Sequence, residues 1–125
     1  MDHIRLSPRL QMVADFVPPC ACVADIGTDH GYLPVWLLQN GIAETAIAAD
    51  IHAGPLANAH QSADAYDLTE RFRFALADGL QFPDAQDADV ITIAGMGGET
   101  ICAIMAAAPW LQEGRRLILQ PQSKV

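Results

Sequence analysis

The segment VADIGTDHGYLP concentrates polar chemistry around two glycines. Gly27 and Gly31 lack a Cβ, so the backbone there can approach a bound group closely. Asp25, Asp29 and His30 lie on either side of these glycines. A structural turn needs about one glycine and one polar residue. The segment therefore carries more ionisable groups than a turn requires, and a ligand site is a natural interpretation.

The same segment changes from an apolar strand into a helix, whose N-terminus favours negative charge. A phosphate would nevertheless be repelled by Asp25 and Asp29. A zwitterion fits better, because its carboxylate can face backbone N–H groups while an ammonium or sulfonium faces the aspartates. Structural interpretations remain open beside this one: Asp25 can cap the turn, and His30 can cap the helix.

Two more carboxylates follow later apolar stretches. Asp50 comes one strand–helix–strand unit after Asp25, where nucleoside-binding α/β folds place the residue that holds a ribose diol. Asp78 follows the next apolar stretch and could reach an adenine amino group. An amino acid, a ribose and an adenine, met in that order, describe S-adenosylmethionine. Alternatively, Asp50 with His52 forms a solvated loop, and Asp78-Gly79 is a common turn.

Alternating strand-like and helix-like segments must position these residues. Apolar runs predict strands over residues 22–26, 45–50, 72–76, 89–94 and 117–120. Helical spacing and capping residues predict helices over 8–17, 32–40, 54–67 and 99–107, with Ser7 as an N-cap, Gly41 as a C-cap and Pro18 as a stop signal. This alternation predicts an α/β, Rossmann-like fold: a mostly parallel sheet with helices on both faces. The candidate residues and the glycines of segment 95–98 then all lie at carboxyl ends of strands, where such sheets bind ligands.

Size and composition limit the class of protein. The chain has 125 residues and is 51% hydrophobic, which suits one domain with a real core. We find no apolar run near the ~18 residues of a membrane span and no signal peptide, so we expect a soluble, cytoplasmic protein with no membrane partner. The net charge of −8 counts against nucleic acid as the partner of this chain alone.

The three cysteines do not suggest a metal site. Cys20 and Cys22 form a pair that could supply two ligands, but no second Cys/His pair follows at ligand spacing. We therefore expect reduced thiols and no metal. Cys102 lies in an apolar helical stretch and is expected in the core, as are Trp36 and Trp110.

Taken together, VADIGTDHGYLP, AAD, LADGL, ITIAGMGGE and LILQP resemble the bacterial TrmK family of tRNA adenine-N1 methyltransferases, which act on adenine 22. The opening LSPRLQMVADFVP resembles the N-terminal helix of that family, and the likeness runs from residue 6 to residue 122. The resemblance implies a Rossmann-like methyltransferase that uses S-adenosyl-L-methionine and has tRNA as its partner.

The resemblance also assigns roles by position. The methionine end of the cofactor would be lined by Asp25, Gly27, Thr28, Asp29, His30 and Gly31. The ribose and adenine would be bordered by Asp50, Ile51, Asp78, Gly79 and Leu80. The point where methyl donor and target base meet would be bordered by Ala94, Gly95, Met96 and Gly97, and the base pocket by Gln120 and Pro121.

The implied reaction sets modest demands on acid–base chemistry. N1 of adenine carries a free lone pair at neutral pH, so no strong general base is needed. The enzyme must flip the base out, align N1 with the methyl group and stabilise a cationic product. Asp29 is the catalytic candidate for that stabilisation. The segment AGMG, in place of the N/D-P-P-Y of exocyclic-amine methyltransferases, fits a ring-nitrogen target.

The family continues with further strands and a helical domain. We therefore expect residues 1–125 to be the N-terminal, cofactor-binding part of a methyltransferase, truncated after the fifth strand, with tRNA binding that requires the C-terminal region. This chain alone is expected to bind cofactor and not to methylate tRNA. Three alternatives remain open: a methyltransferase of small molecules or proteins, an NAD-dependent oxidoreductase, and a non-catalytic interaction module. Against the oxidoreductase, the chain has D-x-G-x-x-x-G where dinucleotide sites have G-x-G-x-x-G.

Overall fold

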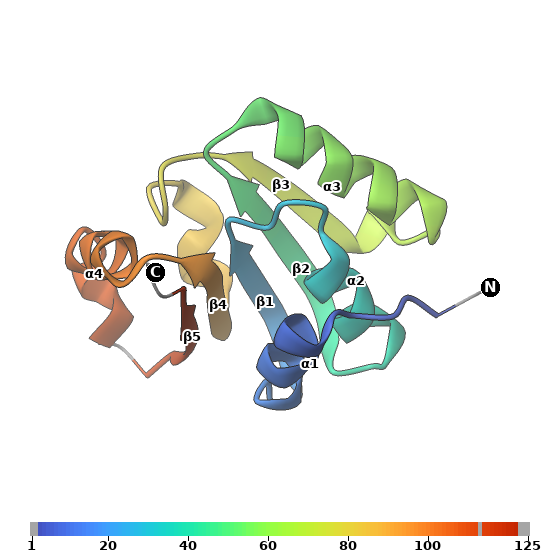
Figure 1. Cartoon of the computed structure of the whole chain (residues 1–125), viewed down its shortest axis with the longest axis horizontal. Helices are drawn as coiled ribbons and strands as arrows, with labels where there is room; N and C mark the ends of the chain where they lie inside the picture. Colours follow the sequence, from blue (N-terminus) through green and yellow to red (C-terminus); the bar gives the residue numbers. More distant parts are fainter. Residues whose placement is uncertain (1–2, 113, 123–125) are drawn as a thin grey trace.

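A five-stranded parallel sheet forms the centre of the protein, in the order β3-β2-β1-β4-β5 (Figure 1). The structure is a computed structural model that describes residues 3–112 and 114–122. The strands are β1 (Cys20–Ile26), β2 (Ala43–Asp50), β3 (Phe72–Leu76), β4 (Val90–Met96) and β5 (Arg116–Pro121). The predicted α/β class and parallel sheet are confirmed.

Among the described residues, four α-helices connect or flank the strands: α1 (Pro8–Asp15), α2 (Tyr32–Gln39), α3 (Ala53–Ala65) and α4 (Gly98–Ala106). The same part of the chain has three 3₁₀ helices, at Thr69–Arg71, Pro83–Asp87 and Pro109–Gln112, which were not predicted because segments this short show no periodicity. No helix in the described ranges is long and apolar enough to cross a membrane.

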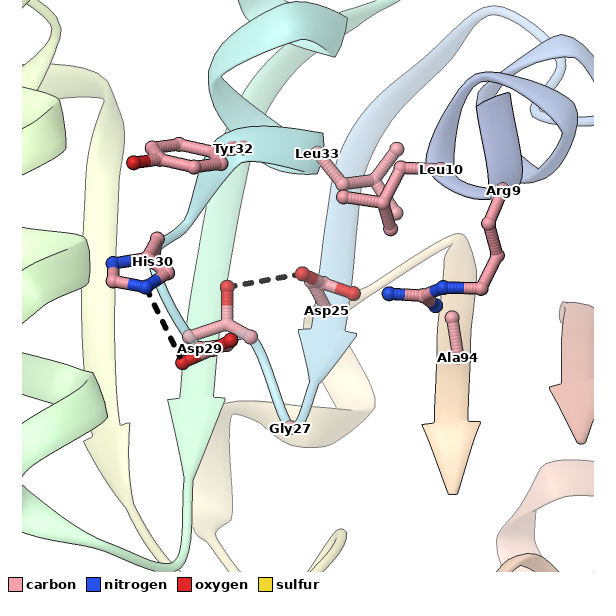
Figure 2. Close-up of a pocket in the computed structure, with 10 residues that line it drawn as sticks. Arg9, Leu10, Asp25, Gly27, Asp29, His30, Tyr32, Leu33 and Ala94 are labelled. Carbon is pink, nitrogen blue, oxygen red and sulfur yellow. Dashed lines mark hydrogen bonds and ion pairs between the residues drawn. The ribbon is translucent and has the colours of Figure 1, made fainter. Parts of the chain in front are cut away.

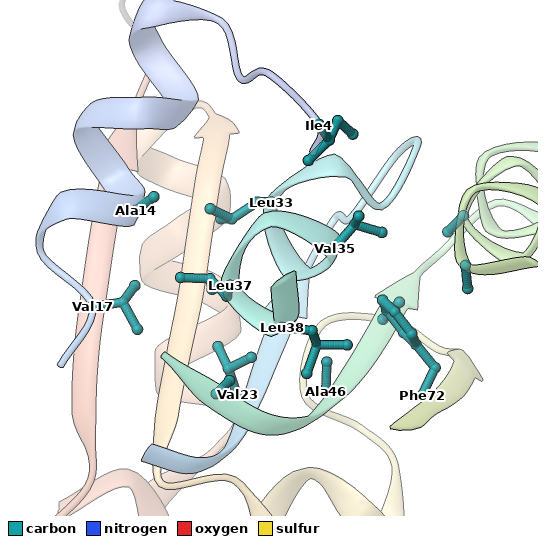
Figure 3. Packing of buried hydrophobic residues seen from close by; sticks show 14 of the residues in the cluster. Ile4, Ala14, Val17, Val23, Leu33, Val35, Leu37, Leu38, Ala46 and Phe72 are labelled. Carbon is teal, nitrogen blue, oxygen red and sulfur yellow. The ribbon is translucent and has the colours of Figure 1, made fainter. Parts of the chain in front are cut away.

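Residues alternate between the two faces of the sheet and fill two separate cores. Val23 of β1 belongs to the cluster formed with α1, α2 and α3, which Figure 3 shows from close by. Its neighbours Cys22 and Ala24 belong to the opposite cluster, formed with α4 and two of the 3₁₀ helices. The period of two along a strand explains this division. Both faces are covered, as the continuous apolar strand sequences predict.

The ends of the helices follow their capping residues. The Ser7 hydroxyl accepts a hydrogen bond from the backbone N–H of Leu10, so the predicted N-cap of α1 is confirmed. This helix ends at Asp15, before the predicted stop at Pro18. Helix α2 ends on Asn40 as its C-cap, and Gly41 follows with a φ of +68°. Gly41, the predicted C-cap, therefore lies one position beyond the observed C-cap, where glycine is most favoured.

Two predictions about β4 and α4 need correction. Strand β4 extends to Met96, beyond its predicted end at residue 94, and α4 begins at Gly98, so segment 95–98 belongs partly to the strand and partly to the helix. The register with β5 shifts between Ala94 and Met96, an irregularity near the end of β4. Cys102 is exposed on α4, and the prediction that it is core was wrong. The helix buries the side that carries Ile101 and Ile104 instead.

Trp36 and Trp110 pack against the two cores as predicted.

Candidate ligand site at the carboxyl ends of the strands

Two adjoining cavities lie at the carboxyl ends of the strands. The β1–β4 cavity, of about 60 Å³, is lined by Arg9, Leu10, Asp25, Gly27, Thr28, Asp29, His30, Tyr32, Leu33 and Ala94 (Figure 2). The β2–β3 cavity, of about 210 Å³, is lined by Ile26, Gly27, Asp50, Ile51, His52, Ala77, Asp78, Gly79, Met96, Thr100 and Ile104. Gly27 belongs to both linings, so the cavities adjoin at the end of β1. This is the crevice where open α/β sheets bind ligands.

Asp25 is a buried carboxylate held by two hydroxyl groups. The Thr28 hydroxyl donates to its Oδ2 at 2.9 Å, and the Thr92 hydroxyl donates to its Oδ1 at 2.7 Å. Thr92 lies opposite Asp25 in the β1–β4 register. Burial raises the pKa of Asp25 from 3.8 to about 6, and the two hydroxyl groups and, more weakly, the Arg9 cation lower it in part. The cavity therefore has a carboxylate at its base that gains from a positively charged ligand.

The loop after β1 has an unusual backbone. Gly27, Asp29 and Gly31 have φ values of +70°, +56° and +74°. Glycine adopts this region freely, and Asp is among the few other residues that tolerate it. A Cβ on Gly31 would lie 3.0 Å from the Cβ of Ala59 in α3, so the close approach of loop and helix requires glycine. Gly31 therefore shapes the loop and does not line either cavity.

Asp50 connects the loops that follow β1 and β2. Its Oδ2 accepts a hydrogen bond from the backbone N–H of Asp29 at 3.1 Å, and its Oδ1 accepts one from the backbone N–H of His52 at 3.0 Å. Each carboxylate oxygen can accept more than one hydrogen bond, so Asp50 retains capacity for a ligand hydroxyl. The residue predicted to hold a ribose thus also fixes the loop that borders the other cavity.

Asp29 and His30 lie at the exposed edge of the β1–β4 cavity. The Asp29 side chain is 71% exposed, and its Oδ1 lies 4.0 Å from Nε2 of His30. The His30 ring stacks on Tyr32 with ring centroids 5.1 Å apart. The catalytic candidate is therefore on the open side of the site, where a second substrate can approach.

The β2–β3 cavity combines an apolar wall with exposed polar residues. Ile104 and Ala77 line it, and Ile51 is 55% exposed at its edge. The Met96 side chain packs so closely over Gly27 that a Cβ there would overlap its terminal methyl group. That methyl is the end of a flexible side chain, so Met96 can change rotamer beside Gly27.

Several predicted residues lie outside both cavities. Leu80 is buried in the core beside α4. Gly97 lines a separate hollow with Gln122. Gln120 points back to β4: its Oε1 accepts a hydrogen bond from the backbone N–H of Gly95 at 3.1 Å. Pro121 is exposed at the end of β5. Within the described ranges, no group of three or more His, Cys, Asp or Glu residues could hold a metal ion.

Sequence reasoning missed Arg9 and Thr92. Arg9 precedes Val13 by about one helical turn, so helical spacing puts it near the buried side of α1. Thr92 is the hydroxyl residue within the apolar segment ITIA, a signal for a buried hydrogen bond. Neither signal indicates that the Thr92 hydroxyl binds Asp25 or that the Arg9 guanidinium is directed at it.

Comparison with known proteins decides the family. The methyltransferase domain model matches residues 6–125, nearly the whole chain. The chain belongs to the methyltransferase domain family.

Three relatives show the similarity in detail. The tRNA (adenine(22)-N(1))-methyltransferase of Bacillus subtilis (strain 168) is 43% identical over 122 residues, which are 97% of this chain and 51% of that protein. A Streptococcus pneumoniae protein in complex with S-adenosyl-L-methionine is 39% identical with a TM-score of 0.88, covering 96% of this chain and 57% of the other. TrmK of M. capricolum in complex with S-adenosyl-homocysteine is 37% identical with a TM-score of 0.76, covering 81% and 46%. The predicted resemblance to TrmK is confirmed, and the methyltransferase domain spans about half the length of these relatives.

Proposed function

We propose that residues 1–125 form the donor-binding domain of a tRNA adenine-N1 methyltransferase that uses S-adenosylmethionine. One observation carries the proposal: an acid-lined small cavity and a larger, partly apolar cavity adjoin at Gly27. These correspond to the charged amino-acid end and the adenosine end of one ligand. The similarity to the B. subtilis enzyme supports the choice of tRNA as methyl acceptor.

The residues present fit this donor. Asp25 and Asp29 supply negative charge for an ammonium and a sulfonium in the β1–β4 cavity. Asp50 supplies acceptor oxygens for a ribose diol, and Ile51 and Ile104 supply apolar surface for an adenine ring. The bound donor contributes an electrophilic methyl group. Because Gly27 has no side chain, the Met96 methyl group occupies the space beside it, where the two cavities adjoin.

The protein's own contribution to the reaction is orientation and charge. Methylation of N1 forms an N–C bond from the ring lone pair and breaks the C–S bond, and the positive charge passes from sulfur to the adenine ring. Asp29, at the exposed edge, is the candidate that stabilises this charge. The uncharged nucleophile needs no base, so alignment of the two reactants supplies much of the rate.

The acidic balance separates donor binding from tRNA binding. A net charge of −8 gives this chain little attraction for tRNA phosphates. We therefore expect donor binding to be a property of this chain, and tRNA affinity to depend on the additional length that the relatives have. With a tRNA-modifying role, we expect the protein to work in the cytoplasm.

A calorimetric titration tests the proposal. We expect saturable binding of S-adenosylmethionine and S-adenosylhomocysteine, no binding of NADH, and at least about tenfold weaker binding after Asp50→Ala. NADH binding without S-adenosylmethionine binding would overturn the proposal in favour of an oxidoreductase. To test the acceptor, transfer of a labelled methyl group to unmodified tRNA with adenine 22 is compared with transfer to the same tRNA with guanine 22, using the full-length protein.

A further inference from the structure

Arg9 is the only Arg or Lys among the residues that line the β1–β4 cavity. It comes from α1, whereas the acidic residues of the cavity come from β1 and the loop after it. Figure 2 shows the Arg9 side chain reaching from the helix past Ala94, with its guanidinium directed at the Asp25 carboxylate. The cavity thus has a cation on one side and carboxylates on the other.

Arg9 is an exposed residue whose guanidinium binds a side chain of β5 and passes close to the backbone of β4. Its Nη1 donates a hydrogen bond to Oε1 of Gln120 at 3.1 Å. The same oxygen accepts from the backbone N–H of Gly95. A Cβ on Gly95 would lie 3.2 Å from Nη1, so the guanidinium passes close over the Gly95 backbone. Arginine carries five N–H donors, and among the described residues only Gln120 accepts from Arg9, which leaves donors for a ligand.

We propose that Arg9 binds the α-carboxylate of the donor's amino-acid end, while Asp25 and Asp29 face its ammonium and sulfonium. This inference rests on the proposed function and identifies the contact by which the protein recognises the amino-acid end of the ligand. A ligand with a single charge would leave either Arg9 or the two aspartates without a counter-charge. An α-amino acid supplies both charges within the reach of a cavity of about 60 Å³.

The contact makes a free carboxylate part of the recognition. A guanidinium fork matches a carboxylate in a way that an ammonium point charge does not. The protein should therefore discriminate S-adenosylhomocysteine from its decarboxylated analogue, 5′-deoxy-5′-(3-aminopropylthio)adenosine, which keeps the amine, ribose and adenine. Removal of Arg9 should abolish that discrimination specifically.

The test is a comparison of two ligands on three proteins. S-adenosylhomocysteine and the decarboxylated analogue are titrated calorimetrically into the wild-type protein, Arg9→Met and Arg5→Met. Arg5 is the matched control, an exposed arginine that lines neither cavity. We expect Arg9→Met to weaken S-adenosylhomocysteine about tenfold or more and to change the analogue by less than about twofold. Arg5→Met should change neither by more than about twofold.

Each other result has a definite meaning. Equal weakening of both ligands by Arg9→Met would overturn the proposal, because Arg9 would then act through Gln120 and Gly95. An unchanged affinity for S-adenosylhomocysteine would overturn it too. If Arg9→Met does not fold, the affinities of the two ligands are compared in Arg9→Lys, which keeps the positive charge and loses the forked guanidinium. Failure of the wild-type protein to bind S-adenosylhomocysteine would instead overturn the proposed function.

Discussion

Thr92 of β4 donates a 2.7 Å hydrogen bond to the carboxylate of Asp25 in β1, at a point where Thr92 has no exposed surface and Asp25 has 5%. This bond crosses the two strands between which the β1–β4 cavity opens. It stabilises the charged form of a carboxylate that burial would otherwise keep neutral. The charge offered to a ligand thus depends on a hydroxyl that does not itself line the cavity.

Replacement of Thr92 by valine should therefore destabilise the protein. The change preserves shape but removes a hydrogen bond to a buried carboxylate, at a cost of about 1–3 kcal/mol in the free energy of unfolding. It should also raise the pKa of Asp25. Urea unfolding measures the first effect. Thr45→Val, which removes an exposed hydroxyl bond to the Ala21 carbonyl, is the control and should change stability by less than about 0.5 kcal/mol. Equal effects of the two substitutions would contradict this account.

The pH dependence of stability should report Asp25 directly. Its folded pKa, about 6, lies above its usual value of 3.8, so folding favours the protonated form. Protonated Asp25 therefore contributes roughly 3 kcal/mol to the free energy of unfolding relative to the ionised form. This contribution is complete below pH 4 and is lost as the pH rises through 6. The unfolding free energy of wild type minus that of Asp25→Asn should therefore fall between pH 4 and 7 and stay level above. A difference that rises over this range would show that Asp25 is ionised more easily in the folded protein.

Ligand binding should show the same titration. The ionised form of Asp25 attracts the ammonium of an amino-acid ligand, so bound donor lowers the pKa of Asp25. We expect S-adenosylhomocysteine to bind more tightly at pH 7.5 than at pH 5, and the dependence to be weaker in Asp25→Asn. Calorimetry at the two pH values measures it. Equal pH dependence in both proteins would assign the effect to another group.

Two glycines with similar backbone angles should respond differently to alanine. Gly31 and Gly41 have φ values of +74° and +68°, so either substitution strains the backbone by about 1 kcal/mol. Only at Gly31 does the new Cβ also meet a neighbour, the Cα of Ala59 at 3.1 Å, whereas nothing lies within 4 Å at Gly41. Gly31→Ala should cost about 1–3 kcal/mol more than Gly41→Ala, measured by thermal unfolding. Equal losses would mean that α3 shifts freely.

Asp50→Ala should loosen two loops even without ligand. The substitution removes the acceptor for the backbone N–H groups of Asp29 and His52. Hydrogen exchange at both amides should therefore accelerate by about tenfold or more. Asp78→Ala, an exposed carboxylate in the same cavity lining, should leave both rates unchanged. Unchanged rates in Asp50→Ala would show that the loop geometry is held by other contacts.

Thiol reactivity should follow exposure. Cys102 is exposed, whereas burial raises the pKa of Cys20 to about 11. Because the thiolate is the reactive form, Cys102 should react with iodoacetamide well before Cys20 at pH 8. Mass spectrometry of partly labelled protein identifies the order. Faster labelling of Cys20 would contradict the partial burial of its side chain at the start of β1.

The strand-end pattern was predictable because it depends on local rules. Apolar runs identify the strands, and a parallel sheet brings their carboxyl ends to one edge, which places Asp25 and Asp50 together. Which side of a helix is buried is harder to predict from the sequence. Helix α4 is apolar enough that Cys102 could lie on either side, and its packing against the sheet determines which side is buried. The Arg9–Gln120 contact has no local signal, because it depends on how α1 docks across the ends of β4 and β5.

That contact joins residues 111 positions apart, one in α1 and the other in β5. During translation Arg9 leaves the ribosome several seconds before Gln120, at about 5–20 residues per second. Until β5 pairs with β4, the guanidinium has no Gln120 to hold it beside Gly95. The complete site therefore forms late in folding. A nascent chain that ends before β5 already contains Arg9 and every acidic residue of the cavity, but it lacks the Gln120 side chain that binds the guanidinium.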